Sequence, residues 1–196
     1  MTVTETHILI VRHPETQANV NGRFVGQGES PYTRLGRVQA RRLPGKIARF
    51  GPDEIWTSPL LRARVVAERA ARLSQRPLRV DDRLIELDFG SAHALTWEEI
   101  TAAGIPFNYR SADEPVAPGG ESRNDLERRV GSIIDQVHEA GGRHAFVCHA
   151  GVMRAALARV LGLVGDQLWA FSIHNAQLAH VRLSGELGTL EEYIQG

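Results

Sequence analysis

Residues 7–16 read HILIVRHPET, an apolar run that ends abruptly in charged and polar residues. A short continuous apolar run is typical of a strand that is buried on both faces, as in a parallel sheet. A second run of this kind, HAFVC at 144–148, is followed directly by His149. The two runs indicate an α/β fold in which two central strands each end beside a histidine.

Helix-like and strand-like segments alternate along the rest of the chain. Thr33 is an expected N-cap, Ser58-Pro59 is typical of an N-cap followed by proline at the first helical position, and Pro44-Gly45 should kink or split its helix. Strand followed by helix in this rhythm predicts a largely parallel sheet. The expected strands are 7–11, 54–57, 78–85, 144–148 and 178–183, and the expected helices are 33–50, 58–73, 96–103, 122–140 and 151–161.

Length and charge limit the protein classes that fit. The chain has 196 residues, with 23 basic and 23 acidic side chains and a formal net charge of zero. We expect a single domain, 1–196, with a short cap insertion at about 91–118 over one end of the sheet. A balanced charge argues against a nucleic-acid partner, which needs a basic footprint. No apolar window is long enough to span a membrane, and a homodimer is left open.

Cysteine content and the N-terminal residues bear on the expected compartment. Cys148 is the single cysteine, so no disulfide can form within the chain. A lone thiol suits a reducing compartment. Residues 1–11 lack the basic region, long apolar stretch and small-residue cleavage site of a signal peptide. We therefore expect a cytoplasmic protein.

Polar residues with related chemistry follow several of the predicted strands. Arg12 and His13 follow the first, Arg62 lies shortly after the second, His149 follows the fourth, and Glu86 lies between them. Ligands of such folds bind at the carboxyl ends of the strands. Arginine forks and helix N-termini favour phosphate, a neutral imidazole can attack phosphorus, and a carboxyl group can protonate a leaving oxygen. The set indicates phosphoryl transfer without a metal.

In this order, these residues resemble the histidine phosphatase superfamily, the phosphoglycerate-mutase-like proteins. The similarity covers nearly the whole chain, from about residue 8 to 181, and implies a three-layer α/β/α fold with a mostly parallel central sheet. The matching blocks are Arg12-His13 with Glu15-Thr16 and Asn19, Ser58-Pro59-Leu60 with Arg62-Ala63, Glu86 with Asp88-Phe89-Gly90, Gly119-Gly120-Glu121-Ser122, and His149.

The resemblance also implies roles for single residues. His13 would form a phosphohistidine, and Glu86 would protonate the leaving group and then activate water. Arg12, Asn19, Arg62 and His149 would hold the phosphoryl group, with no metal or organic cofactor. Pro14 stands where the family usually has glycine; it keeps the carbonyl that can orient the His13 Nδ1–H but loses an N–H. Candidates for the substrate pocket are Arg23, Gln27, His93, Tyr109 and Arg110.

The short 91–118 segment favours hydrolysis over mutase chemistry, because an open cap admits water to a phosphohistidine. We therefore expect a phosphatase that acts on a small phosphorylated substrate, with a phosphoglycerate-type phosphomutase as the first alternative. A second alternative is a cysteine-dependent phosphatase, since Cys148 and Arg154 form a C-x5-R pattern between a strand and a helix. A third is a non-catalytic anion-binding domain. Scattered histidines and one cysteine give no zinc pattern.

Overall fold

The computed structural model describes residues 5–185 and 188–196, so residues 1–4 of the N-terminal stretch considered above lie outside it. These residues contain a sheet with the strand order β3-β2-β4-β1-β5-β6. β1, β2, β3 and β4 pair in parallel, and β5 pairs antiparallel with both β1 and β6. The predicted, mostly parallel α/β sheet is confirmed. Its strands are β1 (Glu5–Arg12), β2 (Glu54–Thr57), β3 (Leu78–Val80), β4 (Gly142–Cys148), β5 (Gln177–Ser184) and β6 (Gly188–Gln195).

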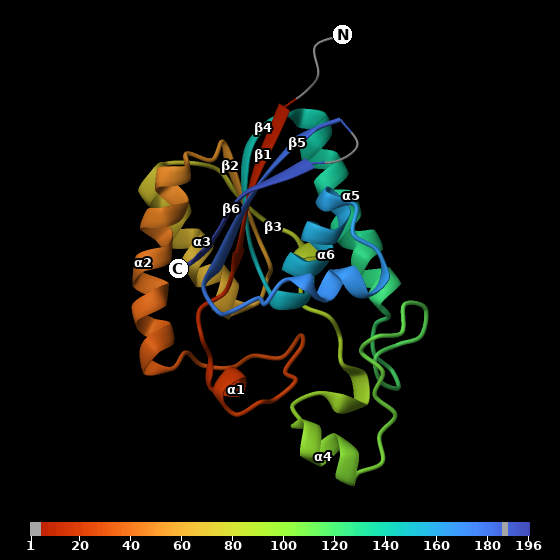
Figure 1. Cartoon of the computed structure of the whole chain (residues 1–196). Coiled ribbons are helices and arrows are strands. Elements are labelled where there is room, and N and C mark those ends of the chain that lie inside the picture. The colour runs from red at the N-terminus through yellow and green to blue at the C-terminus, as the bar shows by residue number, and fades with distance from the viewer. Residues whose placement is uncertain (1–4, 186–187) are drawn as a thin grey trace.

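Helices cover both faces of this sheet. Figure 1 shows α2 (Arg34–Phe50) and α3 (Leu61–Ser74) on one side, and α5 (Arg123–Ala140) and α6 (Ala150–Leu161) on the other. The three-layer arrangement is thus confirmed.

The apolar run of β1 supplies residues to both layers of the core. Ile8 and Ile10 belong to the cluster under α5 and α6, whereas Leu9 and Val11 belong to the cluster under α2 and α3. Successive side chains of a strand point to opposite faces, so a strand covered on both faces must be apolar at every position. Strand β1 therefore lies at the centre of the molecule.

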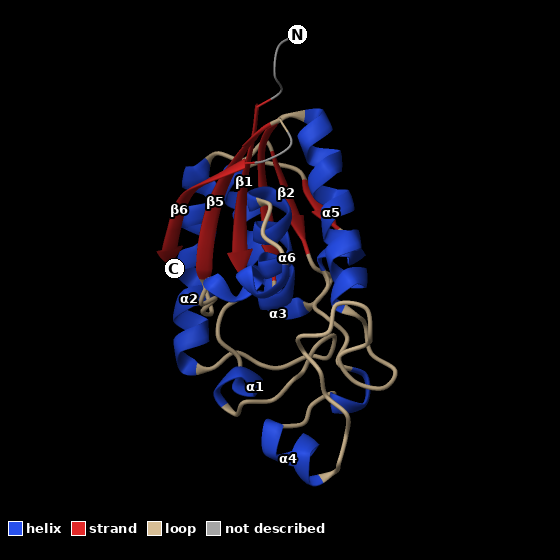
Figure 2. Ribbon diagram, turned by 45° about the vertical axis from the view of Figure 1, so that its right-hand side comes forward, coloured by secondary structure: helices blue, strands red, loops and turns tan. Residues whose placement is uncertain are grey.

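The segment predicted as a cap lies beyond the carboxyl ends of the parallel strands. It contains the 3-10 turn Gly90–Ala92 and the helix α4 (Trp97–Ala102), which Figure 2 shows below the sheet. Thr96 caps α4 by accepting the N–H of Glu99, as the pattern predicted for 96–103. The chain returns to the body where Glu121 N–H donates to the Asp88 carbonyl at 2.9 Å.

Two predicted element boundaries are wrong. The helix expected from Ser58 begins at Leu61 with Leu60 as its N-cap, although the Ser58 hydroxyl, which lies 2.7 Å from His149 Nε2, also accepts the Leu60 N–H at 3.2 Å. The strand expected over 78–85 ends at Val80, where the Asp81 carboxylate accepts the Arg83 N–H at 2.9 Å and starts a 3-10 turn.

The interruption expected at Pro44 is also wrong, since α2 runs unbroken past it. Leu43 and Ile47 are fully buried on either side of the proline, and their packing offsets the backbone hydrogen bond that proline cannot donate. Besides the 3-10 turns Asp82–Leu84 and Gly90–Ala92, the sequence patterns did not predict α1 (Gln17–Val20), the 3-10 helix Gly165–Ala170 or the edge strand β6. Within the described residues, no helix is both long enough and apolar enough to cross a bilayer.

Candidate active site

His13 lies at the exit of β1 and is almost completely buried. Its backbone N–H donates to the Cys148 carbonyl at 2.9 Å, and its own carbonyl accepts the Ala176 N–H at 3.1 Å. The ring Nδ1 lies 2.7 Å from the Pro14 carbonyl oxygen. A carbonyl oxygen can only accept, so Nδ1 carries the proton and Nε2 keeps a free lone pair. The expected role of the Pro14 carbonyl in orienting this ring is confirmed.

His149 follows β4 and faces the first histidine. The two ring centroids are 5.2 Å apart. His149 Nε2 lies 2.7 Å from the hydroxyl of Ser58, while its buried Nδ1 has no protein partner among the described residues. Ser58 was expected to be only a helix cap, and no pattern in the sequence pointed to its contact with His149. Both residues of the pair are completely buried.

Both imidazoles are held neutral. Burial lowers the pKa of His13 well below 6.5, and the positive charges of Arg62 and Arg12 lower it further, although the Pro14 hydrogen bond opposes them. Burial and the same arginines act in the same direction on the pKa of His149. A neutral His13 has the lone pair that a nucleophile needs.

Arg12 and Arg62 provide positive charge on the same cavity as His13. Arg12 Nη1 donates to the Ile173 carbonyl at 2.7 Å, and its buried Nε has no protein partner within residues 5–185 and 188–196. Arg62 is anchored through the carbonyl oxygens of Gly26, at 2.6 Å, and Gly28. Burial lowers the pKa of each guanidinium, whereas nearby Glu86 raises it. As predicted, the two arginines and Glu86 line the same cavity.

Asn19 also lines the cavity, from the short helix α1. Its amide oxygen accepts the Thr16 N–H at 3.0 Å and the Asn175 amide at 3.0 Å. With the oxygen occupied in this way, the amide NH2 is the group left to meet an anion.

Glu86 also lines this cavity. Its carboxylate accepts the Gly151 N–H at 3.1 and 3.2 Å and the Leu87 N–H at 2.9 Å. Gly151 lies in the first turn of α6, where free N–H groups favour an anion. A Cβ on Gly151 would lie 2.4 Å from a Glu86 oxygen, so this contact requires glycine. Glu86 was expected at a strand exit, but it follows the 3-10 turn that replaces the end of that strand.

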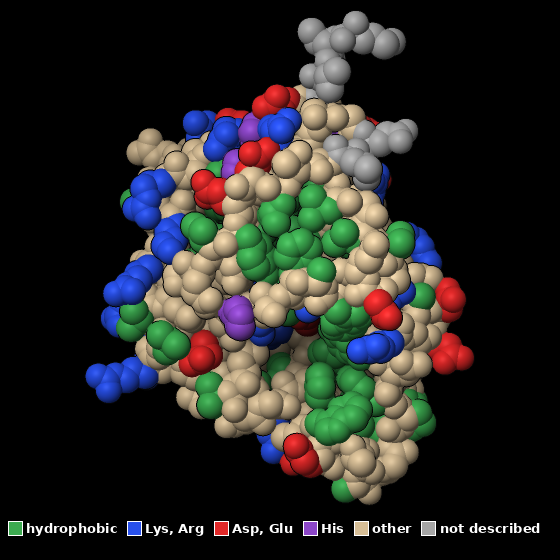
Figure 3. Space-filling view, in the orientation of Figure 1, with side chains coloured by type: hydrophobic (Ala, Val, Ile, Leu, Met, Phe, Trp, Pro, Cys, Tyr) green, Lys and Arg blue, Asp and Glu red, His purple; other side chains and the backbone are tan. Residues whose placement is uncertain are grey.

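Arg12, His13, Asn19, Arg62 and Glu86 line a cavity of about 210 Å³ that opens beside the cap segment, whereas the completely buried His149 is not among its lining residues. Figure 3 shows the surface hollowed between the body and the lower part that carries α4. Among the predicted substrate-pocket residues, Arg23 and Tyr109 line it. Its lining residues are Arg12, His13, Thr16, Ala18, Asn19, Arg23, Phe24, Val25, Gly26, Ser30, Arg62, Glu86, Phe89, Tyr109 and Ala150.

The other three predicted pocket residues do not line the cavity. Gln27 is exposed and donates to the backbone carbonyl of Glu86 at 3.2 Å. His93 is exposed on the cap, and Arg110 is 77% exposed, 4.0 Å from Asp166. Loop residues close in sequence to the site point outward here, and only tertiary structure determines that direction.

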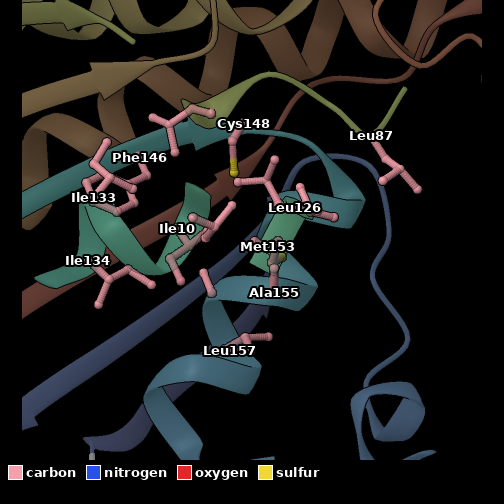
Figure 4. Close-up of a cluster of buried hydrophobic side chains, with 14 of the residues drawn as sticks. Ile10, Leu87, Leu126, Ile133, Ile134, Phe146, Cys148, Met153, Ala155 and Leu157 are labelled. Carbon is pink, nitrogen blue, oxygen red and sulfur yellow. The ribbon is translucent and has the colours of Figure 1, made fainter. Parts of the chain in front are cut away.

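The cysteine pattern is not arranged for catalysis. Cys148 is completely buried, and Figure 4 shows its sulfur directed among apolar side chains such as Leu126 and Met153. Burial raises the pKa of this thiol far above its ordinary value, and the charge of Glu86 raises it further. Arg154 donates to the Leu168 carbonyl at 2.6 Å and stacks on Trp169. The C-x5-R sequence therefore forms no phosphate loop with a thiolate nucleophile.

A resident metal ion would need clustered ligands from the described part of the chain. No group of three or more His, Cys, Asp or Glu side chains there is arranged to hold a metal ion. The charges that face the cavity beside His13 belong to arginines and to Glu86.

The site and fold together match a known class of enzymes. The sequence profile of the histidine phosphatase superfamily (branch 1) matches residues 8–195, and the chain belongs to this superfamily. A phosphoserine phosphatase of Hydrogenobacter thermophilus is 29% identical over 185 residues, or 90% of this chain and 86% of the relative. An Escherichia coli protein named "Probable phosphoglycerate mutase" is 29% identical, with 89% and 83% covered. The structure of a mycobacterial glucosyl-3-phosphoglycerate phosphatase is similar with a TM-score of 0.84 and 26% identity, covering 97% and 100% of the two chains.

Proposed function

We propose that this protein hydrolyses a small phosphomonoester through a phosphohistidine on His13. The observation that carries the proposal is the His13 ring: Nδ1–H is fixed on the Pro14 carbonyl, and Nε2 is free in a cavity that also contains Arg12, Arg62 and Glu86. An oriented neutral imidazole beside two guanidinium groups suits attack on a phosphoryl group.

In the first step, the Nε2 lone pair of His13 attacks phosphorus and the ester P–O bond breaks. The bonding electrons leave with the alcohol oxygen, which takes a proton from the carboxyl group of Glu86. Arg12 and Arg62 stabilise the charge on the transferred phosphoryl oxygens. Asn19 and His149 complete the contacts to that group.

In the second step, the Glu86 carboxylate removes a proton from water as the water oxygen attacks phosphorus. The N–P bond breaks, inorganic phosphate leaves, and His13 returns to its neutral form. Arginines supply the positive charge throughout, so the proposed reaction needs no metal ion or organic cofactor, and a chelator should leave the rate unchanged.

Hydrolysis, rather than transfer to a second hydroxyl, is favoured by the open cavity and by the names of the two phosphatases similar to this chain. Because one relative is named as a probable phosphoglycerate mutase, isomerisation of phosphoglycerate is the alternative activity. The cavity is also too small for a macromolecule, so we propose a small-molecule phosphomonoester as the partner. We propose a cytoplasmic location, which rests on the reduced lone thiol.

The test is a panel of phosphomonoesters assayed by phosphate release, with wild type, His13→Ala and His93→Ala. His93 is the matched control because the structure places it outside the cavity. We expect His13→Ala to lose activity by at least about 10³-fold and His93→Ala to keep it. Conversion of 3-phosphoglycerate to its isomer without phosphate release would contradict the hydrolase proposal, and so would activity that survives in His13→Ala.

A further inference from the structure

The cavity extends beyond the phosphoryl-binding groups, and its outer part differs chemically from the inner part. Resting on the function proposed above, we propose that this outer part selects phosphate esters of alcohols that carry an aromatic or apolar group. Phosphate esters that carry a carboxylate are disfavoured there. The ion pair between Arg23 and Glu99 accounts for the discrimination against carboxylates.

Three aromatic side chains form one side of the cavity, which we call the aromatic wall: Phe24, Phe89 and Tyr109. Phe24 contacts Phe89 with ring centroids 5.2 Å apart, and Tyr109 stacks on Phe89 at 6.1 Å. Phe107 supports the wall from behind, 4.9 Å from Phe24. A rigid aromatic surface of this kind binds flat or apolar groups through burial and ring contacts.

Arg23 is the one cation, besides Arg12 and Arg62, among the described residues that line the cavity. Its guanidinium, however, already forms an ion pair with Glu99. Nη1 lies 2.8 Å and Nη2 3.0 Å from the two oxygens of Glu99, and Nη1 also donates to the Ala94 carbonyl at 2.7 Å. Glu99 occupies one edge of this guanidinium and balances its charge, so a second carboxylate gains less from Arg23 than it would from an unpaired arginine.

Glu99 is fixed in turn by the helix that carries it. Its carboxylate accepts the Thr96 N–H at 2.9 Å, and its own N–H donates to the Thr96 hydroxyl, so it closes the capping box of α4. The carboxylate that pairs with Arg23 is thus held in place by the first turn of α4.

The remaining polar groups offer a carboxylate no positive partner. The Ser30 hydroxyl accepts the Ala18 N–H at 3.0 Å, and the Thr16 hydroxyl donates to the Asn19 amide oxygen at 2.9 Å. A substrate carboxylate would lose its hydration without gaining an ion pair, and this cost discriminates against it.

Three alkyl phosphates separate the two preferences: glycerol 3-phosphate, 3-phosphoglycerate and benzyl phosphate. The first two share a carbon skeleton and differ at one end by a carboxylate, and benzyl phosphate adds a ring while keeping an alkyl leaving oxygen. For wild type, we expect kcat/KM to be about tenfold higher for benzyl phosphate than for glycerol 3-phosphate. We expect it to be lower for 3-phosphoglycerate than for glycerol 3-phosphate.

Substitutions at Glu99 and Phe24 test which residues cause the discrimination against carboxylates and the preference for aromatic groups. Glu99→Gln can keep the capping box but frees Arg23, so kcat/KM for 3-phosphoglycerate should rise about fivefold, the scale of a partly exposed ion pair. The matched control is Glu98→Gln, a neighbouring exposed carboxylate on α4 for which the structure has no ion pair. Phe24→Leu should lower the preference for benzyl phosphate, while turnover of glycerol 3-phosphate shows that this variant folds.

The inference is overturned if wild type turns over 3-phosphoglycerate at least as well as glycerol 3-phosphate, or if Glu99→Gln and Glu98→Gln behave alike. In either case, loss of turnover in His13→Ala would leave the proposed function intact. Absence of His13-dependent turnover with every ester would overturn the proposed function, and the inference with it.

Discussion

Gly151 is the residue on which the position of Glu86 depends most directly. Its N–H contacts both carboxylate oxygens of Glu86, and the space that a side chain would need is filled by one of them. The carboxyl group is thereby held at the start of α6, where it lines the same cavity as Arg12 and Arg62. A displaced carboxyl group would still be present in the molecule but would no longer reach the leaving oxygen.

Gly151→Ala should therefore damage proton donation more than phosphate binding. We expect kcat/KM for benzyl phosphate, which reports the steps up to departure of the alcohol, to fall about 100-fold, the usual scale of general acid catalysis. The loss should be much smaller for p-nitrophenyl phosphate, whose leaving group needs little protonation. Steady-state kinetics on both esters test this, with Gly131→Ala as the control because a Cβ there meets only ordinary contacts. Equal losses on the two esters would argue against the role of Glu86.

Single-residue chemistry was the part of the site that the sequence predicted best. Arg12, His13, Arg62, Glu86 and Asn19 all reach one cavity because the end of β1, the start of α3, the segment after the turn 82–84 and the short helix α1 bring them there. Gln27, His93 and Arg110 do not, because the direction of a loop side chain depends on packing that no local pattern encodes. The Ser58–His149 contact joins residues far apart in the chain, and its discovery needed the fold.

Among the elements, α2 supports the active-site end of the sheet from one face. Its residues Leu43 and Ile47 are completely buried against the strands, whereas Leu35 on the same helix is 53% exposed. Unbroken packing along this helix explains why Pro44 does not divide it.

Leu43→Ala should lower the free energy of unfolding by about 2–5 kcal/mol, because a fully buried leucine leaves a cavity when truncated. Leu35→Ala, the matched exposed change, should alter it by no more than about 0.5 kcal/mol. Urea denaturation followed by circular dichroism measures both. Equal effects of the two substitutions would contradict the packing described for α2.

Buried strands and helices were predicted more accurately than exposed ones. The central strands were predicted because burial on both faces leaves continuous apolar runs, as at 7–11 and 144–148. The edge strand β6 was missed because most of its side chains remain exposed or half-exposed, and its sequence GTLEEYIQ reads as polar. The start of α3 was misplaced because the backbone is still extended at Leu60, although the Ser58 hydroxyl accepts the Leu60 N–H.

For the molecule as a whole, the neutral buried histidines couple folding to pH. His13 and His149 have pKa values well below 6.5 in the folded protein, whereas in the unfolded chain they return to about 6.5. Below pH 6.5 the unfolded state therefore binds more protons than the folded state. Stability contributed by these groups is complete above about pH 6.5 and decreases as the pH falls from there towards the folded-state values.

The free energy of unfolding of wild type should thus fall on acidification from pH 6.5 to 5 with a slope of up to about 1.4 kcal/mol per pH unit for each of the two histidines. His13→Ala removes one of these groups, so its slope should be smaller by about one such contribution. Denaturant titrations at several pH values give both slopes. Parallel curves for the two proteins would show that His13 is not held neutral by folding.

The proposed function depends on a phosphoryl group that would be bound to His13 Nε2 between two half-reactions. The most direct measurement is rapid quench of wild type and His13→Ala with a ³²P-labelled phosphomonoester, followed by phosphopeptide mapping under alkaline conditions. We predict an acid-labile, alkali-stable label on the peptide that contains His13, with inorganic phosphate as the final product and no label in the variant. Label on the Cys148 peptide, or turnover without any labelled peptide, would contradict the proposed mechanism.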